Sequence, residues 1–178
     1  MKKCFVSVLM GLILSTFMGT AYGSVRYATQ NLGGGYWEYI YSVTNDNFAS
    51  NLDEFTITFP YGYGFSDLQI ITKANWATAA YDPTLNFGGT PVDGYYIAVA
   101  DYGMGIVSGA IDSGFTLKFY WPNPPDYPPT NLYLPVSAVS TTGEIWSGTT
   151  EPVPEPSTYL LLSISLLSIA VVRKQLVK

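Results

Sequence analysis

The chain has 178 residues, one cysteine, no histidine and a formal net charge of −5 at pH 7. The length fits one domain with short extensions. Without histidine the chain has no Ser-His-Asp or Cys-His nucleophile and no histidine-ligated zinc. The acidic balance argues against nucleic acid as a partner, because affinity for nucleic acid comes mostly from Lys and Arg on phosphates.

The first residues are typical of a secretory signal peptide. Lys2 and Lys3 lead into the apolar run 4–18, which at about 15 residues is shorter than a spanning helix. Small residues follow and place the expected cleavage site at Ala21, Gly23 and Ser24. Cleavage after Ala21 is the alternative. We therefore expect signal peptidase to remove residues 1–23, the only cysteine among them, so that the mature chain has no disulfide.

Residues 24–146 predict an all-β domain. Apolar and polar residues alternate with the period of two that is typical of strands. The clearest strands are expected at 37–43, 55–59, 95–99 and 115–121, and weaker ones at 68–72, 76–81, 104–110, 132–136 and 144–146. Turn residues separate them, and no long amphipathic helix is visible. This pattern favours an antiparallel β-sandwich, with a closed barrel as the alternative.

Aromatic residues are the strongest signal for binding in this domain. Flat aromatic rings stack on the C–H faces of sugars, but strands also favour Tyr, Phe and Trp, so only exposed rings would support binding. The best candidates lie in a glycine-rich segment and in the proline-rich loop 122–130, and they are Tyr61, Tyr63, Phe65 and Tyr127.

The acidic residues offer two further readings. A pair of carboxylates could serve a glycosidase, but most of these residues adjoin turn formers, where Asp caps a turn, so we expect no enzyme. Segments 45–47 and 51–54 gather oxygen ligands suited to calcium, yet a hairpin turn explains the same residues. We therefore expect no cofactor, with calcium as the alternative.

The C-terminal end has three parts in order. The motif Val153-Pro154-Glu155-Pro156 comes first, then the apolar stretch 159–172, and then the basic pair Arg173 and Lys174. Fourteen helical residues reach about 21 Å against a hydrocarbon core of about 30 Å, so a span is tight. The basic pair would act as a membrane stop on the cytoplasmic side. We expect a linker at 147–156 and a single transmembrane segment with a basic tail at 157–178.

This order of parts resembles the PEP-CTERM sorting signal of Gram-negative bacteria. The resemblance implies an exosortase, a membrane cysteine protease or transpeptidase, as the processing partner. It also implies transient anchoring in the inner membrane, followed by placement at the cell surface or in the extracellular matrix. A plain single-pass anchor after a proline-rich stalk is the alternative for the tail.

The body also resembles that of many PEP-CTERM proteins, in segments 36–45 with 53–60 and in segment 106–121. This likeness implies an immunoglobulin-like sandwich. The family further implies association with biofilm and extracellular polysaccharide. We therefore expect a structural or binding component of biofilm or exopolysaccharide, with a carbohydrate-binding module that uses exposed aromatics as the alternative.

Overall fold

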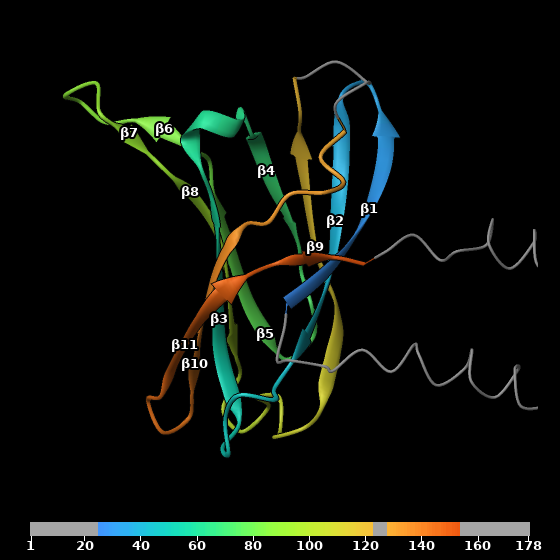
Figure 1. The fold of residues 1–178 in the computed structure, drawn as a ribbon, viewed down its shortest axis with the longest axis vertical. Coiled ribbons are helices and arrows are strands. Elements are labelled where there is room, and N and C mark those ends of the chain that lie inside the picture. Colours follow the sequence, from blue (N-terminus) through green and yellow to red (C-terminus); the bar gives the residue numbers. More distant parts are fainter. Residues whose placement is uncertain (1–24, 123–127, 154–178) are drawn as a thin grey trace, which may run out of the picture.

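The computed structural model describes residues 25–122 and 128–153 (Figure 1). Alternation of buried and exposed side chains shapes most of the longer strands. The elements in chain order are β1 (Val25–Gly33), β2 (Tyr36–Thr44), β3 (Leu52–Phe59), the 3-10 helix η1 (Tyr61–Tyr63), β4 (Ser66–Ile71), β5 (Trp76–Tyr81), β6 (Thr84–Leu85), β7 (Pro91–Val92), β8 (Gly94–Ala100), β9 (Ile111–Tyr120), β10 (Pro135–Ser140), β11 (Ile145–Thr149) and β12 (Glu151–Pro152).

Two five-stranded sheets form the two layers seen in Figure 1. The first has the strand order β12-β1-β2-β9-β4, and the second has the order β11-β10-β3-β8-β5. Neighbouring strands are antiparallel except for β1 and β12, which pair in parallel. The short hairpin β6–β7 projects from the upper left of the view. The expected all-β fold with antiparallel sheets is confirmed, and in the described residues the sheets do not close into one barrel.

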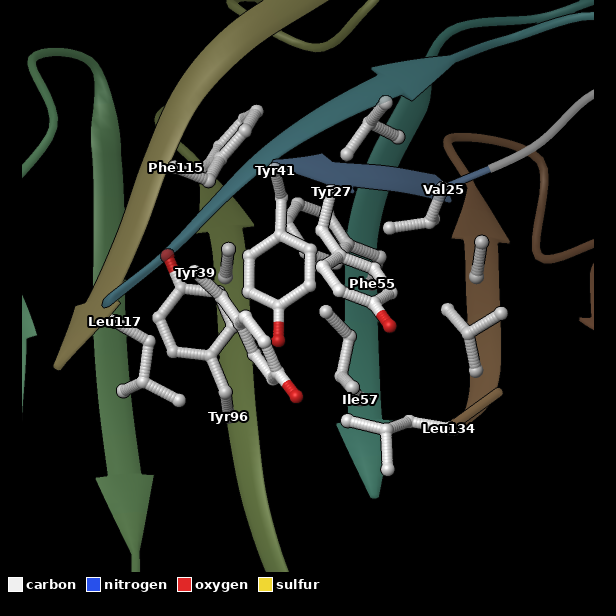
Figure 2. Packing of buried hydrophobic residues seen from close by; sticks show 14 of the residues in the cluster. Val25, Tyr27, Tyr39, Tyr41, Phe55, Ile57, Tyr96, Phe115, Leu117 and Leu134 are labelled. Atoms are coloured by element: carbon white, nitrogen blue, oxygen red, sulfur yellow. The ribbon is translucent and has the colours of Figure 1, made fainter. Parts of the chain in front are cut away.

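The core lies between the two sheets and is unusually aromatic (Figure 2). Tyr41 on β2 lies opposite Tyr27 and Phe115 in the strand register, and all three side chains are buried. Phe55 from the second sheet meets Phe115 edge to face, with ring centroids 4.8 Å apart. This contact stabilises the packing of the two sheets, because it buries apolar surface and sets the positive edge of one ring against the negative face of the other.

Two core tyrosines hold the end of the proline-rich loop and the residues just after it. The Tyr27 hydroxyl donates to the Leu132 carbonyl oxygen and accepts from the Leu132 N–H, both at 2.7 Å. The Tyr39 hydroxyl donates to the Pro129 carbonyl oxygen at 2.6 Å. The polar ends of these buried rings are thus satisfied by backbone groups, as buried hydroxyls require.

The sequence pattern failed at several places in the body. It did not predict the short strands β6 and β7, and it expected a strand at 132–136 where β10 runs over Pro135–Ser140. It missed β1, where alternation is clear only at Val25 and Tyr27 and the rest of the strand faces solvent. It also predicted a strand at 104–110, which instead forms turns, with Met104 N–H donating to Asp101 O and Ala110 N–H to Val107 O. Glycines at 103, 105 and 109 permit these turns.

The expected linker was also placed too early. Residues 147–149 belong to β11, and Glu151 and Pro152 form β12 against β1. The Val153 N–H then donates to the Tyr27 carbonyl oxygen at 2.8 Å. The chain thus crosses from β11, at the edge of the second sheet, to β12, at the edge of the first, and its backbone groups pair with strands of both sheets. Only residues 154–156 of that linker lie outside the described part.

Candidate functional site

Val153 is the one residue of the expected sorting motif that the structure describes. Its side chain is exposed while its N–H is held by β1. In the described residues no helix is long and apolar enough to cross a membrane, and the expected segment 157–178 lies outside them. The other predicted processing residues also lie outside, and these are Ala21, Gly23, Ser24, Pro154, Glu155, Pro156, Arg173 and Lys174.

Tyr61 and Tyr63 lie on η1, at the end of the sandwich that is uppermost in Figure 1. Their side chains are 36% and 43% exposed. The Asp93 carboxylate accepts the Tyr61 N–H at 2.9 Å, and Gly64 closes the helix in the left-handed region at φ +80°. Both rings are thus available to solvent on a segment with fixed ends.

Phe65 does not join them, and its predicted exposure is wrong. It is 3% exposed and packs edge to face on Phe59 and Phe119, with centroids 4.9 and 5.1 Å apart. The turn at Gly64 directs the next side chain into the core rather than outward. Tyr127, the remaining candidate aromatic, lies outside the described residues.

A second pair of exposed tyrosines lies at the same end, on the outer face of the first sheet. Tyr36 begins β2 and Tyr120 ends β9, and they are cross-strand partners with ring centroids 5.5 Å apart in an edge-to-face arrangement. An added Cβ on Gly35 would lie 2.6 Å from Tyr120 Cε2, so the ring lies against the glycine backbone. Sequence reasoning missed this pair because it did not predict which strands are neighbours.

The adjoining strand β4 brings polar groups to these rings. The Asp67 carboxylate oxygen Oδ2 accepts from the Tyr36 hydroxyl at 2.9 Å and from Gln69 Nε2 at 2.8 Å. This hydrogen bond to a carboxylate raises the pKa of Tyr36 above its usual value. We call Tyr36, Tyr120, Asp67 and Gln69 the Tyr36–Tyr120 cluster.

Asp67 has an unusual backbone conformation, with φ +52° in the left-handed region. Non-glycine residues rarely adopt it, and it costs on the order of 1 kcal/mol or more. Asp67 lies in β4, where the register against β9 shifts between Ser66 and Gln69. The Asp82 carboxylate holds this irregular part of the strand by accepting the Asp67 N–H at 3.1 Å and the Leu68 N–H at 2.7 Å. The cluster therefore rests on an irregular part of β4 that a second acidic residue fixes.

One of the candidate calcium residues, Asn45, has structural partners. Asn45 is fully buried, and its Nδ2 donates to the carbonyl oxygens of Ser50 and Ile106 at 2.8 and 2.7 Å. Its Oδ1 accepts the Phe48 N–H at 3.2 Å. In the described part of the chain no three His, Cys, Asp or Glu residues gather as metal ligands would.

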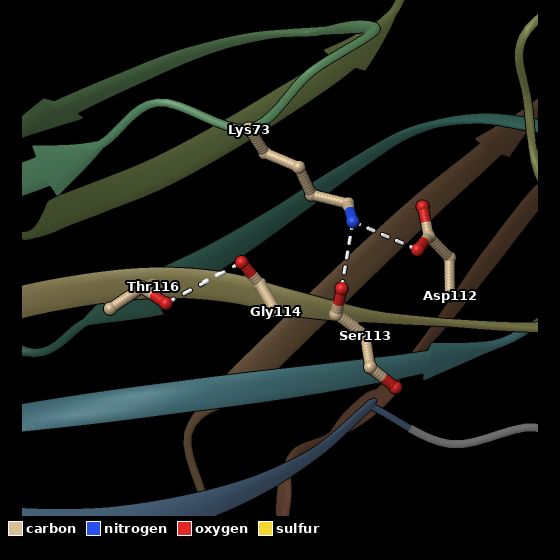
Figure 3. A network of polar contacts seen from close by, with 5 residues as sticks. All are labelled: Lys73, Asp112, Ser113, Gly114 and Thr116. Atoms are coloured by element: carbon tan, nitrogen blue, oxygen red, sulfur yellow. Dashed lines mark hydrogen bonds and ion pairs between the residues drawn. The ribbon is translucent and has the colours of Figure 1, made fainter.

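A cation between β4 and β5, Lys73, lies beside the start of β9 (Figure 3). Lys73 Nζ pairs with Asp112 Oδ1 at 2.9 Å and donates to the Ser113 carbonyl oxygen at 2.7 Å. It also lies 4.7 Å from the centroid of the Phe115 ring. This partly buried cation has an anion, a carbonyl and a ring as partners, which indicates a structural rather than a catalytic role.

Comparison with solved structures found protein chains of low sequence identity. A crystal structure of an uncharacterized protein from Nocardia farcinica, described as having an immunoglobulin-like fold, has 16% identity and a TM-score of 0.49, over 73% of this chain and 88% of that chain. A GH20 exo-β-N-acetylglucosaminidase from Vibrio harveyi has 11% identity and a TM-score of 0.36, and the match covers 75% of this chain but only 18% of the enzyme.

Sequence comparison bears on the C-terminal end. No curated protein sequence matches the chain. A family model of the PEP-CTERM protein-sorting motif matches residues 152–174, which begin at Pro152 in β12. The chain therefore carries the PEP-CTERM protein-sorting motif that its tail predicted, and this motif supports export, membrane-associated sorting and an exosortase as the processing partner.

Proposed function

We propose that this protein is a structural or binding component of the extracellular matrix or cell surface of a Gram-negative bacterium, delivered there by exosortase processing of its tail. The observation that carries the proposal is the sorting motif at 152–174. A membrane segment after the motif would keep the substrate at the bilayer surface, which raises its effective concentration near a membrane enzyme. Prolines on both sides of Glu155 would keep the motif extended and suited to a protease cleft.

The folded body is consistent with binding rather than catalysis. Its core consists of packed aromatic and aliphatic side chains, and the described tyrosines with the most strongly raised pKa values, Tyr39 and Tyr41, are buried between the sheets. Residues 24–156 carry 3 basic and 13 acidic residues, a charge of −10, which favours a soluble extracellular component.

Intact mass of the protein recovered from its own host tests the sorting proposal. We expect the wild-type protein to begin near Ser24 and to end near Pro156, and any covalent adduct to appear as added mass. A variant with Pro154→Ala, Glu155→Ala and Pro156→Ala should keep its tail and stay in the membrane fraction. The control Glu151→Gln, just before the motif, should be processed normally. If wild type and triple variant both retain 157–178, the tail is only an anchor and the proposal is wrong.

A carbohydrate-binding module is the second candidate function. The observation that favours it is the grouping of exposed tyrosines at one end of the sandwich, among them Tyr36, Tyr61, Tyr63 and Tyr120. Retention on a column of the host's own polysaccharide tests it. Retention that survives Tyr61→Ala together with Tyr63→Ala would remove η1 from the binding surface.

A further inference from the structure

The Tyr36–Tyr120 cluster combines an exposed aromatic surface with positioned polar groups. Tyr36 and Tyr120 are 37% and 36% exposed. The Tyr120 ring covers Gly35, which has φ +85°, and any side chain at position 35 would clash with the ring. The ring is therefore packed against the Gly35 backbone.

The carboxylate beside these rings has unused acceptor capacity. Asp67 Oδ2 accepts two hydrogen bonds, whereas no described residue donates to Asp67 Oδ1. An ionised carboxylate offers about four acceptor sites. Asp82 accepts the backbone N–H groups of Asp67 and Leu68, and Tyr36 and Gln69 hold Asp67 Oδ2, so the carboxylate is positioned before any ligand arrives.

We propose that the Tyr36–Tyr120 cluster is a binding subsite for a neutral pyranose unit of an extracellular glycan. The inference rests on the second candidate function, the binding of extracellular polysaccharide, and it names the surface and the chemical class of the ligand. The tyrosine rings supply flat surfaces for the C–H groups of the sugar. Asp67 accepts hydrogen bonds from its hydroxyl groups, and Gln69 supplies an amide beside it.

Charge selects a neutral glycan over an acidic one. Asp67 and Asp82 lie at the cluster. Lys118 lies in the strand register between Gln69 on β4 and Glu38 on β2, so one cation there stands against three carboxylates. A uronate or sulfated unit would meet these carboxylates and the overall charge of the body, and like charges repel. A sugar that carries only hydroxyl groups has no charge and is not repelled.

The position of the cluster suits a protein held by its C-terminal end. Tyr36 begins β2 and Tyr120 ends β9, and both strand ends lie at the top of Figure 1, whereas β12 ends at mid-height on the right. The subsite is thus separate from the point at which the chain leaves the sandwich. A glycan bound there would not compete with the tail for the same surface.

The test uses the protein isolated from host cultures and the host's own extracellular polysaccharide, separated by anion exchange into neutral and acidic fractions. Affinity electrophoresis measures retardation by each fraction. We expect the neutral fraction to retard the wild-type protein and the acidic fraction not to. Tyr120→Ala and Asp67→Asn should each weaken retardation by about tenfold, and Tyr36→Phe, which removes one hydroxyl, by about threefold.

A second tyrosine pair provides the matched control. Tyr81 and Tyr95 lie on the outer face of the other sheet, exposed, with centroids 4.7 Å apart. Tyr81→Ala should leave retardation unchanged. Circular dichroism confirms that each variant is folded, and Tyr36→Phe provides a folded variant if Tyr120→Ala is not.

The outcomes separate this inference from the proposed function. If the wild-type protein is retarded but Tyr120→Ala, Asp67→Asn and Tyr36→Phe bind like wild type, the subsite is wrong while association with polysaccharide stands. Stronger retardation by the acidic fraction, or an equal loss in Tyr81→Ala, also overturns the subsite. If neither fraction retards the wild-type protein, the association itself fails, whatever the mass of the processed chain shows.

Discussion

Alkaline pH should unfold this sandwich steeply, because three tyrosines of its core cannot ionise in place. Burial raises the pKa of Tyr39, Tyr41 and Tyr96 above the usual value of 10. Below pH 10 the folded and unfolded chains keep the same hydroxyl protons, so this contribution to stability is complete. Above pH 10 the unfolded chain releases three protons that the folded chain retains, so the free energy of unfolding falls as pH rises.

The magnitude follows from three protons at 1.36 kcal/mol per pH unit each. The free energy of unfolding should fall by about 4 kcal/mol at pH 11 and by about 8 kcal/mol at pH 12. A domain is stable by only about 5–15 kcal/mol, so the sandwich should unfold near pH 11–12. Tyr27 acts in the same direction, since burial raises its pKa to about 12 against the opposing effect of its hydrogen bond to Leu132.

Ultraviolet absorbance of tyrosinate and far-ultraviolet circular dichroism, followed on one pH titration, test this account. Exposed tyrosines should ionise first with the fold intact, and the buried ones should ionise together as the strand signal disappears. Tyr96→Phe should reduce the steepness by about 1.4 kcal/mol per pH unit. Ionisation of every tyrosine in one shallow phase near pH 10, with circular dichroism unchanged, would refute the reasoning.

Three further predictions concern single contacts. Tyr41→Phe should raise the free energy of unfolding by about 1 kcal/mol, because the buried Tyr41 hydroxyl has no partner in the described residues. Tyr39→Phe should lower it by about 1 kcal/mol, because it leaves the Pro129 carbonyl oxygen unpaired. Urea unfolding in which both substitutions changed stability in the same direction would contradict this pair of predictions. Lys73→Met should lower it by about 1 kcal/mol by removing the partly buried ion pair with Asp112, and an unchanged urea midpoint would show that the pair is neutral. EGTA should leave Tm unchanged because the Asn45 amide is already satisfied; a fall in Tm that calcium reverses would contradict it.

The strands that sequence predicted best are those with one face fully buried. In β2 the inward residues Tyr39, Tyr41 and Val43 alternate strictly with outward ones, and β3 behaves in the same way. β1 lacks that regularity beyond Tyr27, since its place depends on pairing with β2 after a run of glycines. Local pattern therefore predicted the strands that dominate the core and missed one that depends on a neighbour.

The candidate site shows the same limit. Alternation places Tyr36 and Tyr120 on outward faces, but their contact requires β2 beside β9, and the contact with Asp67 requires β4 beside β9. These pairings are set by packing of segments far apart in the chain. Phe65 shows the converse error, since its glycine-rich neighbours suggested exposure while the turn at Gly64 buries it.

The parallel pairing of β12 with β1 has a consequence for the timing of assembly. Arg26 on β1 lies opposite Glu151 on β12 in the register, and the two side chains form an ion pair at 3.6 Å. This edge of the first sheet is therefore complete only when β12, which holds nearly the last described residues, has paired with β1. A chain emerges from synthesis with its N-terminal end first, and pairings between distant segments form late. Closure of this edge therefore coincides with the emergence of the sorting motif, whose match begins in the same strand.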